Sequence, residues 1–215
     1  MEIIDFVLNV DVYLERIIEN YGSLSYGILF AIVFAETGFV LTPFLPGDSL
    51  LFASGMFAAI GALNVVMLFF VIWLASFLGD NVNYWVGYHF GKKIVANHRI
   101  PINQRHIDKT EDFFRNHGKK AIFFARFMPI LRTFAPFVAG VGKMEYRKFL
   151  IFSLVGGFSW VTSFVLLGYF FGNMPLVKDN FSVVILVIIF ISISPAIIKI
   201  IKNKIQKRPQ DQVGI

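Results

Sequence analysis

The stretch FFARFMPILRTFAPFVAG (residues 123–140) places two arginines and two prolines within eleven residues of strongly apolar sequence. The arginines are Arg126 and Arg132, and the prolines are Pro129 and Pro136. Proline removes a backbone hydrogen-bond donor and clashes with the preceding turn of a helix. We therefore expect the apolar segment to break as a helix at both prolines, with the charged side chains beside the breaks.

The composition of the whole chain indicates what surrounds this stretch. Of 215 residues, 56% are hydrophobic and 16% are charged, and the mean hydropathy is +0.67. Soluble domains average about 25% charged residues. The composition therefore favours a membrane protein with a single domain. The chain has no cysteine, which excludes disulfides and thiolate metal sites.

Three stretches are long and apolar enough to cross a bilayer, which takes about 20 residues of helix. They are residues 65–90, 149–172 and 181–200. Two further apolar regions, 26–60 and 121–141, are interrupted by proline and glycine. Interrupted backbone at membrane depth is tolerated only where it is buried in protein or lines a cavity. We therefore expect two re-entrant hairpins, with breaks at Pro46, Gly47, Pro129, Pro136 and Gly140.

Positive charge is concentrated in two places. Residues 92–120 carry eight Lys and Arg against three acids, and residues 199–210 carry five with no acid. An excess of Lys and Arg beside membrane spans marks the cytoplasmic side, so both segments are predicted to face the cytoplasm. Within the first, residues 102–118 are predicted to form an amphipathic helix that ends at Gly118. Nucleic acid is not an expected partner, because the charges flank spans and no nucleic-acid-binding module is recognisable.

Residues 1–22 differ from a cleavable signal peptide, because they lack a basic start and carry acids throughout. Their apolar residues recur at helical spacing, which predicts an amphipathic helix on the membrane surface, with a simple solvated helix as the alternative. The sequence does not decide on which side of the membrane it lies. The predicted parts of the single domain are the N-terminal helix (1–22), repeat one (26–91), the basic cytoplasmic loop (92–120), repeat two (121–173), a C-terminal span (181–203) and a basic tail (204–215).

Two similar motifs point to an internal repeat. GYHFGKK (87–93) and GYFFGNM (168–174) each close a predicted span, and the preceding hairpins end in Ser-Gly (54–55) and Ala-Gly (139–140). The first span is predicted to end at the cytoplasm and the second outside. We therefore expect an all-α polytopic membrane fold of two inverted repeats, each a re-entrant helical hairpin followed by a transmembrane helix. This is the architecture of secondary transporters, with the site at the midplane. Chance packing motifs are the alternative.

The interrupted regions also carry charges of opposite sign. Glu36 and Asp48 lie in the first, and Arg126 and Arg132 lie in the second. A charge at the bilayer centre costs on the order of 3 kcal/mol or more unless it is paired or wetted, so the four groups are expected to meet. They could be ion pairs that only hold the hairpins together. They could also line a cavity in which the arginine forks grip phosphate oxygens and a carboxylate carries a proton.

A fifth charged residue, Asp80, lies within the predicted span 65–90. The favoured interpretation is a polar residue bonded to a neighbouring helix, and the alternative is a second proton site. The walls of the expected cavity are apolar and rich in phenylalanine, which favours a lipid ligand over soluble phosphate.

Two stretches, AETGFVLTPFLPGDSLLFASG (35–55) and FFARFMPILRTFAPFVAGVGKM (123–144), resemble the signature sequences of the bacterial DedA family, also called SNARE-associated or VTT-domain proteins. The resemblance covers about residues 20–200. It implies a multi-pass protein of the bacterial inner membrane with two re-entrant hairpins. It also implies a lipid flippase, with undecaprenyl phosphate returned to the cytoplasmic leaflet in dependence on the proton motive force. Carried over residue by residue, it assigns substrate binding to Arg126, Arg132 and Thr133, and proton coupling to Glu36 and Asp48.

Other functions remain open at this point. They are a flippase or scramblase of phospholipid such as phosphatidylethanolamine, a structural role in membrane homeostasis and, less favoured, a lipid phosphatase. An enzyme needs a nucleophile and a proton donor at the phosphate, whereas all four histidines lie at or in the basic loop. We therefore expect no catalytic residue, no metal and no cofactor. The expected partners are a membrane lipid and protons, and a homo-oligomer remains open.

Overall fold

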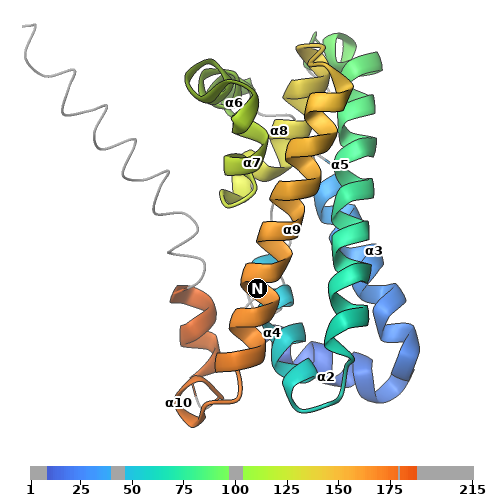
Figure 1. Cartoon of the computed structure of the whole chain (residues 1–215), viewed down its shortest axis with the longest axis vertical. Coiled ribbons are helices and arrows are strands. Elements are labelled where there is room, and N and C mark those ends of the chain that lie inside the picture. The colour runs from blue at the N-terminus through green and yellow to red at the C-terminus, as the bar shows by residue number, and fades with distance from the viewer. Residues whose placement is uncertain (1–8, 40–46, 97–103, 179, 188–215) are drawn as a thin grey trace, which may run out of the picture.

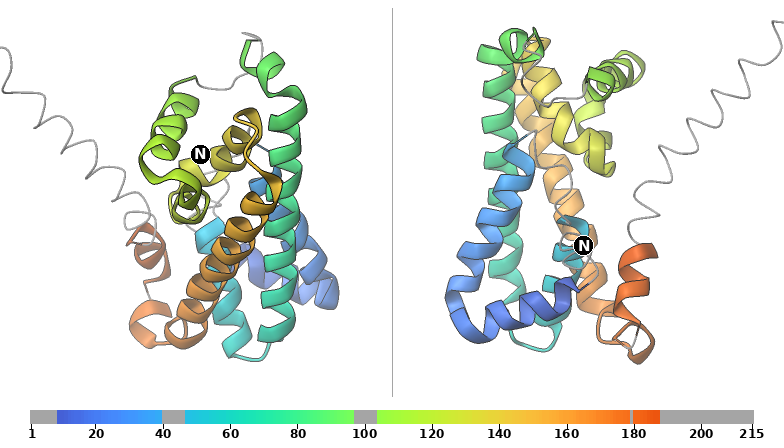
Figure 2. Two further views of the ribbon diagram at one scale, coloured as in Figure 1. Left: turned by 45° about the horizontal axis from the view of Figure 1, so that its top comes forward. Right: turned by 180° about the vertical axis from the view of Figure 1, so that it is seen from behind.

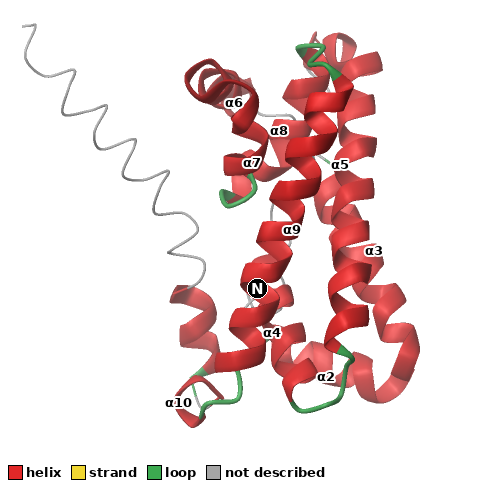
Figure 3. Cartoon of the chain, viewed as in Figure 1, coloured by secondary structure: helices red, strands yellow, loops and turns green. Residues whose placement is uncertain are grey.

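The computed structural model describes residues 9–39, 47–96, 104–178 and 180–187. Every regular element in these ranges is a helix, and these ranges contain no strand (Figure 3). The elements are α2 (Val10–Tyr21), η1 (Gly22–Leu24), α3 (Ser25–Gly38), α4 (Gly47–Ala59), α5 (Val65–Ala96), α6 (Gln104–His117), η2 (Gly118–Lys120), α7 (Ala121–Ala125), α8 (Pro129–Val141), α9 (Tyr146–Phe171) and α10 (Pro175–Lys178). Residues 181–187 are helical as well. The predicted all-helical class is confirmed for this part of the chain.

Two long helices, α5 and α9, run the length of the molecule (Figure 1). They contain the predicted spans 65–90 and 149–172 almost completely. Within the described part of the chain, three segments are long and apolar enough to cross a membrane: Val10–Gly38, Val65–Gly91 and Tyr146–Phe171. Large apolar side chains on the outer faces of α5 and α9 are exposed, as contact with lipid requires, among them Phe70, Leu74, Ile151, Phe158 and Leu167.

The first apolar segment, Val10–Gly38, changes direction at Gly22. This glycine has φ +53°, a left-handed conformation that glycine adopts at little cost. In consequence α2 lies across the lower end of the molecule, whereas α3 rises beside α5 (Figure 2, right). Residues Val10 and Leu14 of α2 are buried, and Glu15 is exposed. An amphipathic helix is thus present within the predicted range 1–22, of which residues 1–8 lie outside the described part.

Each of the two long helices has a shorter helix packed along half of its length. In Figure 1, α4 lies beside the lower half of α9, and α8 lies beside the upper half of α5. Glycines bring the backbones together at both crossings. A Cβ atom on Gly55 of α4 would collide with a backbone carbonyl of α9, and one on Gly140 of α8 would collide with a backbone carbonyl of α5. The glycines of the two GYxFG motifs, Gly87 on α5 and Gly168 on α9, complete these contacts from the other side.

The predicted break points in the second apolar region are partly wrong. Helix α7 ends at Ala125, Met128 is extended (φ −119°, ψ 108°), and Pro129 opens α8. Pro129 fits this place because the first turn of a helix needs no N–H donor there. Pro136 and Gly140, however, lie inside α8 and break nothing. The helix continues through Pro136 because regular bonds persist on both sides, from Arg132 N to Met128 O (2.8 Å) and from Gly142 N to Val138 O (2.9 Å).

Three further predictions concern the start of α4, the amphipathic helix and the C-terminal span. Gly47 is the first residue of α4, while Pro46 lies outside the described residues. The amphipathic helix predicted over 102–118 is observed as α6, and it ends at Gly118, which has φ +57°. Most of the predicted C-terminal span 181–203 and the whole of the basic tail 204–215 also fall outside the described part.

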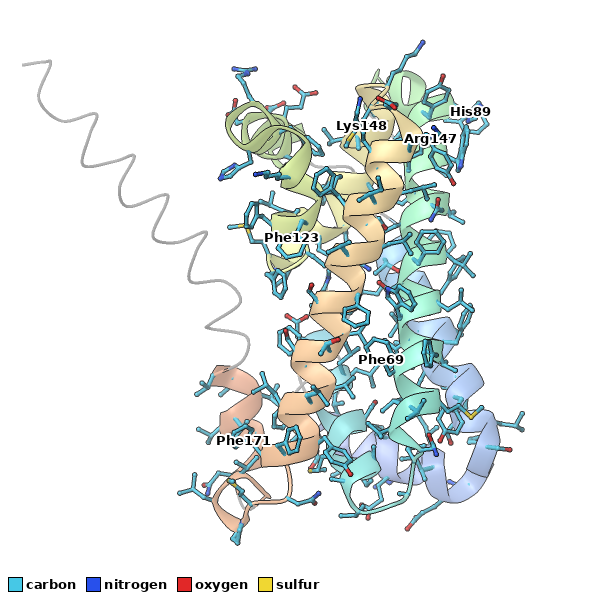
Figure 4. The ribbon with its side chains drawn as sticks, in the orientation of Figure 1. Phe69, His89, Phe123, Arg147, Lys148 and Phe171 are labelled. Carbon is cyan, nitrogen blue, oxygen red and sulfur yellow. The ribbon has the colours of Figure 1, made fainter. Side chains whose placement is uncertain are left out.

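The apolar core has a large cluster between α3, α4, α5 and α9, with Leu29, Leu51, Ile72 and Val165 among its fully buried members. Buried charged residues from α3, α4, α5 and α8, and Arg126 after α7, form ion pairs with one another inside the molecule. The two ends of the molecule differ: Arg147, Lys148 and His89 lie together at the upper end, and Phe171 lies at the lower end (Figure 4).

Candidate functional site

Arg132 joins the ends of α3 and α4 to α8. Its Nη1 donates a hydrogen bond to Asp48 Oδ1 at 2.5 Å, and its Nη2 donates to Glu36 Oε1. All three residues are buried: Glu36 is 1% exposed, Asp48 8% and Arg132 4%. One guanidinium therefore holds two carboxylates from two different helices, as charge compensation between the interrupted regions requires.

The local sequence explains how Glu36 reaches this position. Glu36 lies near the end of α3, and Gly47 opens α4. A Cβ atom on Gly47 would overlap the carboxylate of Glu36, so only glycine permits the approach. The carboxylate thereby lies at the N-terminus of α4, where unpaired N–H groups and the helix dipole stabilise an anion. Asp48 lies in the same first turn.

Arg126 forms a separate pair with Asp80. Arg126 is the C-cap residue directly after α7, and its Nη1 donates to Asp80 Oδ1 at 2.5 Å. The other carboxylate oxygen of Asp80 accepts a hydrogen bond from Ser153 Oγ of α9 at 2.6 Å. Asp80 is thus bonded to neighbouring helices, in agreement with the favoured interpretation of the sequence. The expectation that the arginines would be balanced by Glu36 and Asp48 alone misses this third acid.

Trp160 connects the two arginine pairs. The centroid of its ring lies 4.5 Å from Arg132 Cζ and 5.4 Å from Arg126 Cζ, which is cation–π distance for both. Its Nε1 donates to Asp48 Oδ1 at 2.8 Å. Sequence reasoning assigned Trp160 no specific role. The available signal was its place halfway along a predicted span, since membrane tryptophans concentrate near span ends.

Thr133 and Asn83 tie the cluster to the helices around it. Asn83 Nδ2 on α5 donates to the carbonyl of Thr133 on α8 at 2.7 Å and to the carbonyl of Thr37 on α3 at 3.1 Å. Both Thr133 and Asn83 are fully buried. The structure therefore places Thr133 beside the cluster, while its contact with substrate stays a prediction. Asn83 was not singled out from the sequence.

The cluster carries unequal charge. It contains three carboxylates and two guanidiniums, so its formal charge is −1 when all five groups are ionised. A proton or a cation would neutralise this excess, and buried uncompensated charge is costly. Among residues 9–39, 47–96, 104–178 and 180–187, no group of three His, Cys, Asp or Glu side chains is placed to hold a metal ion.

Several buried polar atoms of the cluster have no hydrogen-bond partner among the described residues. They are Glu36 Oε2, Arg132 Nε, both Nε and Nη2 of Arg126, and Ser76 Oγ nearby. Buried polar atoms are nearly always hydrogen-bonded in proteins, so such atoms mark places where a ligand, a proton or water can bind.

The chain is similar to known membrane proteins over most of its length. Residues 45–170 match the VTT domain. Protein DedA of Escherichia coli (strain K12) is 48% identical over 205 residues, which cover 94% of each chain. An uncharacterized membrane protein of Mycobacterium tuberculosis (strain ATCC 25618 / H37Rv) is 39% identical over 181 residues, 83% of this chain and 79% of the relative. Inner membrane protein YqjA of E. coli (strain K12) is 32% identical over 155 residues, 72% of this chain and 70% of the relative.

No solved structure matches the chain. The domain match covers more than half of the residues, and the similarity to DedA extends over nearly the whole chain. The protein therefore belongs to the DedA family of membrane proteins, which carry the VTT domain.

Proposed function

We propose that this protein is a translocase that moves an anionic, phosphate-headed lipid between the leaflets of the inner membrane, driven by protons. Undecaprenyl phosphate is the substrate that we expect. The observation that carries the proposal is the buried cluster in which Arg132 is shared by Glu36 and Asp48 and Arg126 is held by Asp80. A guanidinium fork that holds two carboxylate oxygens matches two phosphate oxygens equally well.

The cluster is better suited to exchange of partners than to stability. Buried ion pairs stabilise proteins less than apolar packing of the same volume. Here the charges come from α3, α4, α5 and α8 and from the residue directly after α7, so any relative movement of these helices changes their pairing. A phosphate group that competes for Arg132 would release Glu36 and Asp48, and the released carboxylates could then take up protons. Lipid binding and proton uptake would be coupled in this way.

The helix arrangement supports the re-entrant hairpins and the inverted repeats as part of this proposal. Helix α4 packs on α9 through Gly55 and Gly168, and α8 packs on α5 through Gly140 and Gly87. The matching motifs of the two halves thus make equivalent contacts in opposite directions along the molecule (Figure 1). We further propose that the end bearing Arg147 and Lys148 faces the cytoplasm, because positive charge near span ends marks that side.

A structural role is the second candidate, because every charged group of the cluster has an opposite partner in this conformation. In that case the ion pairs would only fix the helices. We propose no catalytic role for the cluster. The hydroxyl of Ser153 donates a hydrogen bond to the Asp80 carboxylate, and no hydrogen bond from this hydroxyl to an imidazole is present among the described residues.

Leaflet transfer in proteoliposomes tests the proposal. A labelled polyprenyl phosphate and a labelled phosphatidylethanolamine are compared with and without an imposed pH gradient. We expect transfer of the polyprenyl phosphate that depends on the gradient, and loss of this transfer in Arg132→Lys. Equal transfer of both lipids without a gradient would instead indicate a phospholipid scramblase. Absence of transfer for every lipid, in protein that folds, would support the structural role.

A further inference from the structure

A groove runs along the outer side of the upper half of α5. Its volume is about 460 Å³, and its walls include Leu78, Val82, Trp85 and His89 of α5 and Phe34 of α3. Leu78, Val82 and Trp85 are exposed, as side chains in contact with lipid are. None of the five charged residues of the polar cluster lines this groove, so it is a separate feature of the molecule.

The groove has the length of one leaflet of a bilayer. From Leu78 to His89, α5 rises by about 16 Å, and half of the hydrocarbon core of a bilayer is about 15 Å thick. Leu78 is close to the level of Asp80 in the polar cluster, and His89 lies at the end that carries Arg147 and Lys148 (Figure 4). One extended acyl chain therefore fits the groove with its head group at the upper end.

Aromatic side chains mark the level of the head groups at this end. The ring of Trp85 has three aromatic neighbours, with centroids 5.6 Å away for Tyr88, 5.3 Å for Tyr146 and 5.2 Å for His89. Tryptophan and tyrosine concentrate at the interface between membrane and water. The upper end of the groove thus lies where the phosphate of a bilayer lipid is found.

Lys143, in the loop between α8 and α9, has an unusual backbone conformation. Its φ is 50°, and no other described residue except glycine has a positive φ. Hydrogen bonds from Lys143 N to Gly140 O and from Met144 N to Ala139 O, both 2.9 Å, hold the loop in this shape. Glycine is the usual residue in a left-handed conformation after a helix, and lysine adopts it only with strain. Strain of this kind is concentrated at ligand sites.

The ammonium group of Lys143 lies near the groove without a counter-charge. Lys143 Nζ is 5.9 Å from the centroid of Tyr88, whose ring contacts Trp85 in the wall of the groove. Within the described part of the chain, no carboxylate forms an ion pair with Lys143. The acid in the same loop, Glu145, is bonded to Lys148 instead. An uncompensated positive charge at this level attracts anionic lipids.

We propose that the groove holds an acyl chain of a resident anionic phospholipid and that Lys143 binds the phosphate of its head group. The occupant is a lipid such as phosphatidylglycerol. Phosphatidylethanolamine fits less well, because its ammonium group would face Lys143 while Glu145 is occupied by Lys148. A polyprenyl phosphate has a chain longer than the groove. The site is distinct from the polar cluster and does not depend on the proposed function.

The position of Trp85 in the wall of the groove allows binding to be measured by fluorescence. The full-length protein is reconstituted into bilayers that contain phosphatidylglycerol or phosphatidylethanolamine with brominated acyl chains, which quench tryptophan. The part of the quenching that Trp85→Phe removes belongs to the groove. We expect phosphatidylglycerol to bind there about 5-fold more tightly than phosphatidylethanolamine, the effect of one lysine on an anionic lipid.

Lys143→Gly separates lipid binding from stability. It removes the charge and relieves the backbone strain, so the preference for phosphatidylglycerol should disappear while the unfolding temperature stays equal or rises. Lys148→Gln is the matched control. It removes a positive charge from the same end of the molecule, but one that Glu145 already compensates, so the preference should remain.

A second pair of variants tests the groove itself. Val82→Phe places a larger apolar side chain in the groove, which should lower the preference for phosphatidylglycerol. Val66→Phe makes the same substitution at an exposed position of α5 outside the groove, and it should leave the preference unchanged.

Several outcomes would overturn the proposal. Equal binding of the two lipids by the unchanged protein would show that no such site exists. A preference that persists in Lys143→Gly would show that this lysine does not bind the phosphate, and an equal loss in Lys148→Gln would indicate only a general effect of surface charge. Displacement of phosphatidylglycerol by farnesyl phosphate at lower concentration than by phosphatidylglycerol itself would assign the groove to the transported lipid. If Lys143→Gly does not fold, Lys143→Asn decides, because asparagine also tolerates the left-handed conformation.

Discussion

The pair Arg126–Asp80 offers the sharpest separation of a structural role from a functional one. Asp80→Asn keeps the shape of the side chain and an oxygen for Ser153, but it leaves a buried guanidinium without its counter-charge. Removing one partner of a buried ion pair costs about 3–5 kcal/mol, a large part of the 5–15 kcal/mol that stabilises a typical protein. Arg126→Gln should lower the stability by a similar amount, because it leaves the buried Asp80 carboxylate without its guanidinium partner.

The double variant Asp80→Asn/Arg126→Gln removes both charges. Its destabilisation should be smaller than the sum of the two single effects, because no unpaired charge stays buried. Its transport activity should nevertheless remain lost, since the phosphate-binding group is absent. The exposed pair Arg115–Asp112 on α6 gives the control, and Asp112→Asn should change stability by less than about 1 kcal/mol.

The measurements are equilibrium unfolding in detergent mixtures with a denaturing surfactant, and leaflet transfer of a labelled polyprenyl phosphate. Recovery of both stability and transport in the double variant would refute the reasoning, because the pair would then be only a structural link. Unchanged stability in Asp80→Asn would refute it differently, by showing that Arg126 does not depend on this carboxylate.

Three further predictions concern the Arg132 group. Arg132→Lys should insert normally but lose most transport, since lysine keeps the charge and loses the planar fork that reaches Glu36 and Asp48 together; full activity in the transfer assay would contradict this. Gly47→Ala should displace the Glu36 carboxylate and lower both the unfolding temperature and transport, whereas Gly27→Ala, which has open space around it, should change neither. Glu36→Gln and Asp48→Asn should still bind farnesyl phosphate, but their transport should no longer respond to a pH gradient; a retained response would remove these acids from proton coupling.

The general plan of the molecule could be predicted because each part of it follows from a local property. Length and hydropathy determine the spans that became α5 and α9, and the lack of other compensation within the apolar regions forces acids and arginines to meet. The charged residues of both interrupted regions could therefore be named in advance. Glycine at Gly118 likewise marked the end of α6 correctly.

The pairing of individual groups could not be predicted from the sequence. Which carboxylate faces Arg126 depends on how far α7 extends and on the rotation of α5. Tertiary packing sets both, of α7 against α8 and α9 and of α5 against α3, α8 and α9. The mid-span position of Trp160 distinguishes it from interfacial tryptophans, but the sequence does not show which groups its ring contacts. Pro136 was wrongly expected to end a helix. The expectation considered only the donor that proline lacks, whereas the neighbouring hydrogen bonds and tertiary packing keep α8 helical across this position.

The glycine contacts between short and long helices have a mechanical consequence. Two couples of helices, α4 with α9 and α8 with α5, are in direct backbone contact. The two helices of one couple therefore cannot slide past each other without collision. Hydrogen bonds of the polar cluster link one couple to the other, beside the apolar contacts between α5 and α9: Arg132 of α8 reaches Asp48 of α4, and Ser153 of α9 reaches Asp80 of α5. Shear between the couples would exchange these partners while both couples stay rigid. A movement of one helix pair against the other would therefore have to rearrange the hydrogen bonds of the polar cluster together with the apolar contacts between α5 and α9.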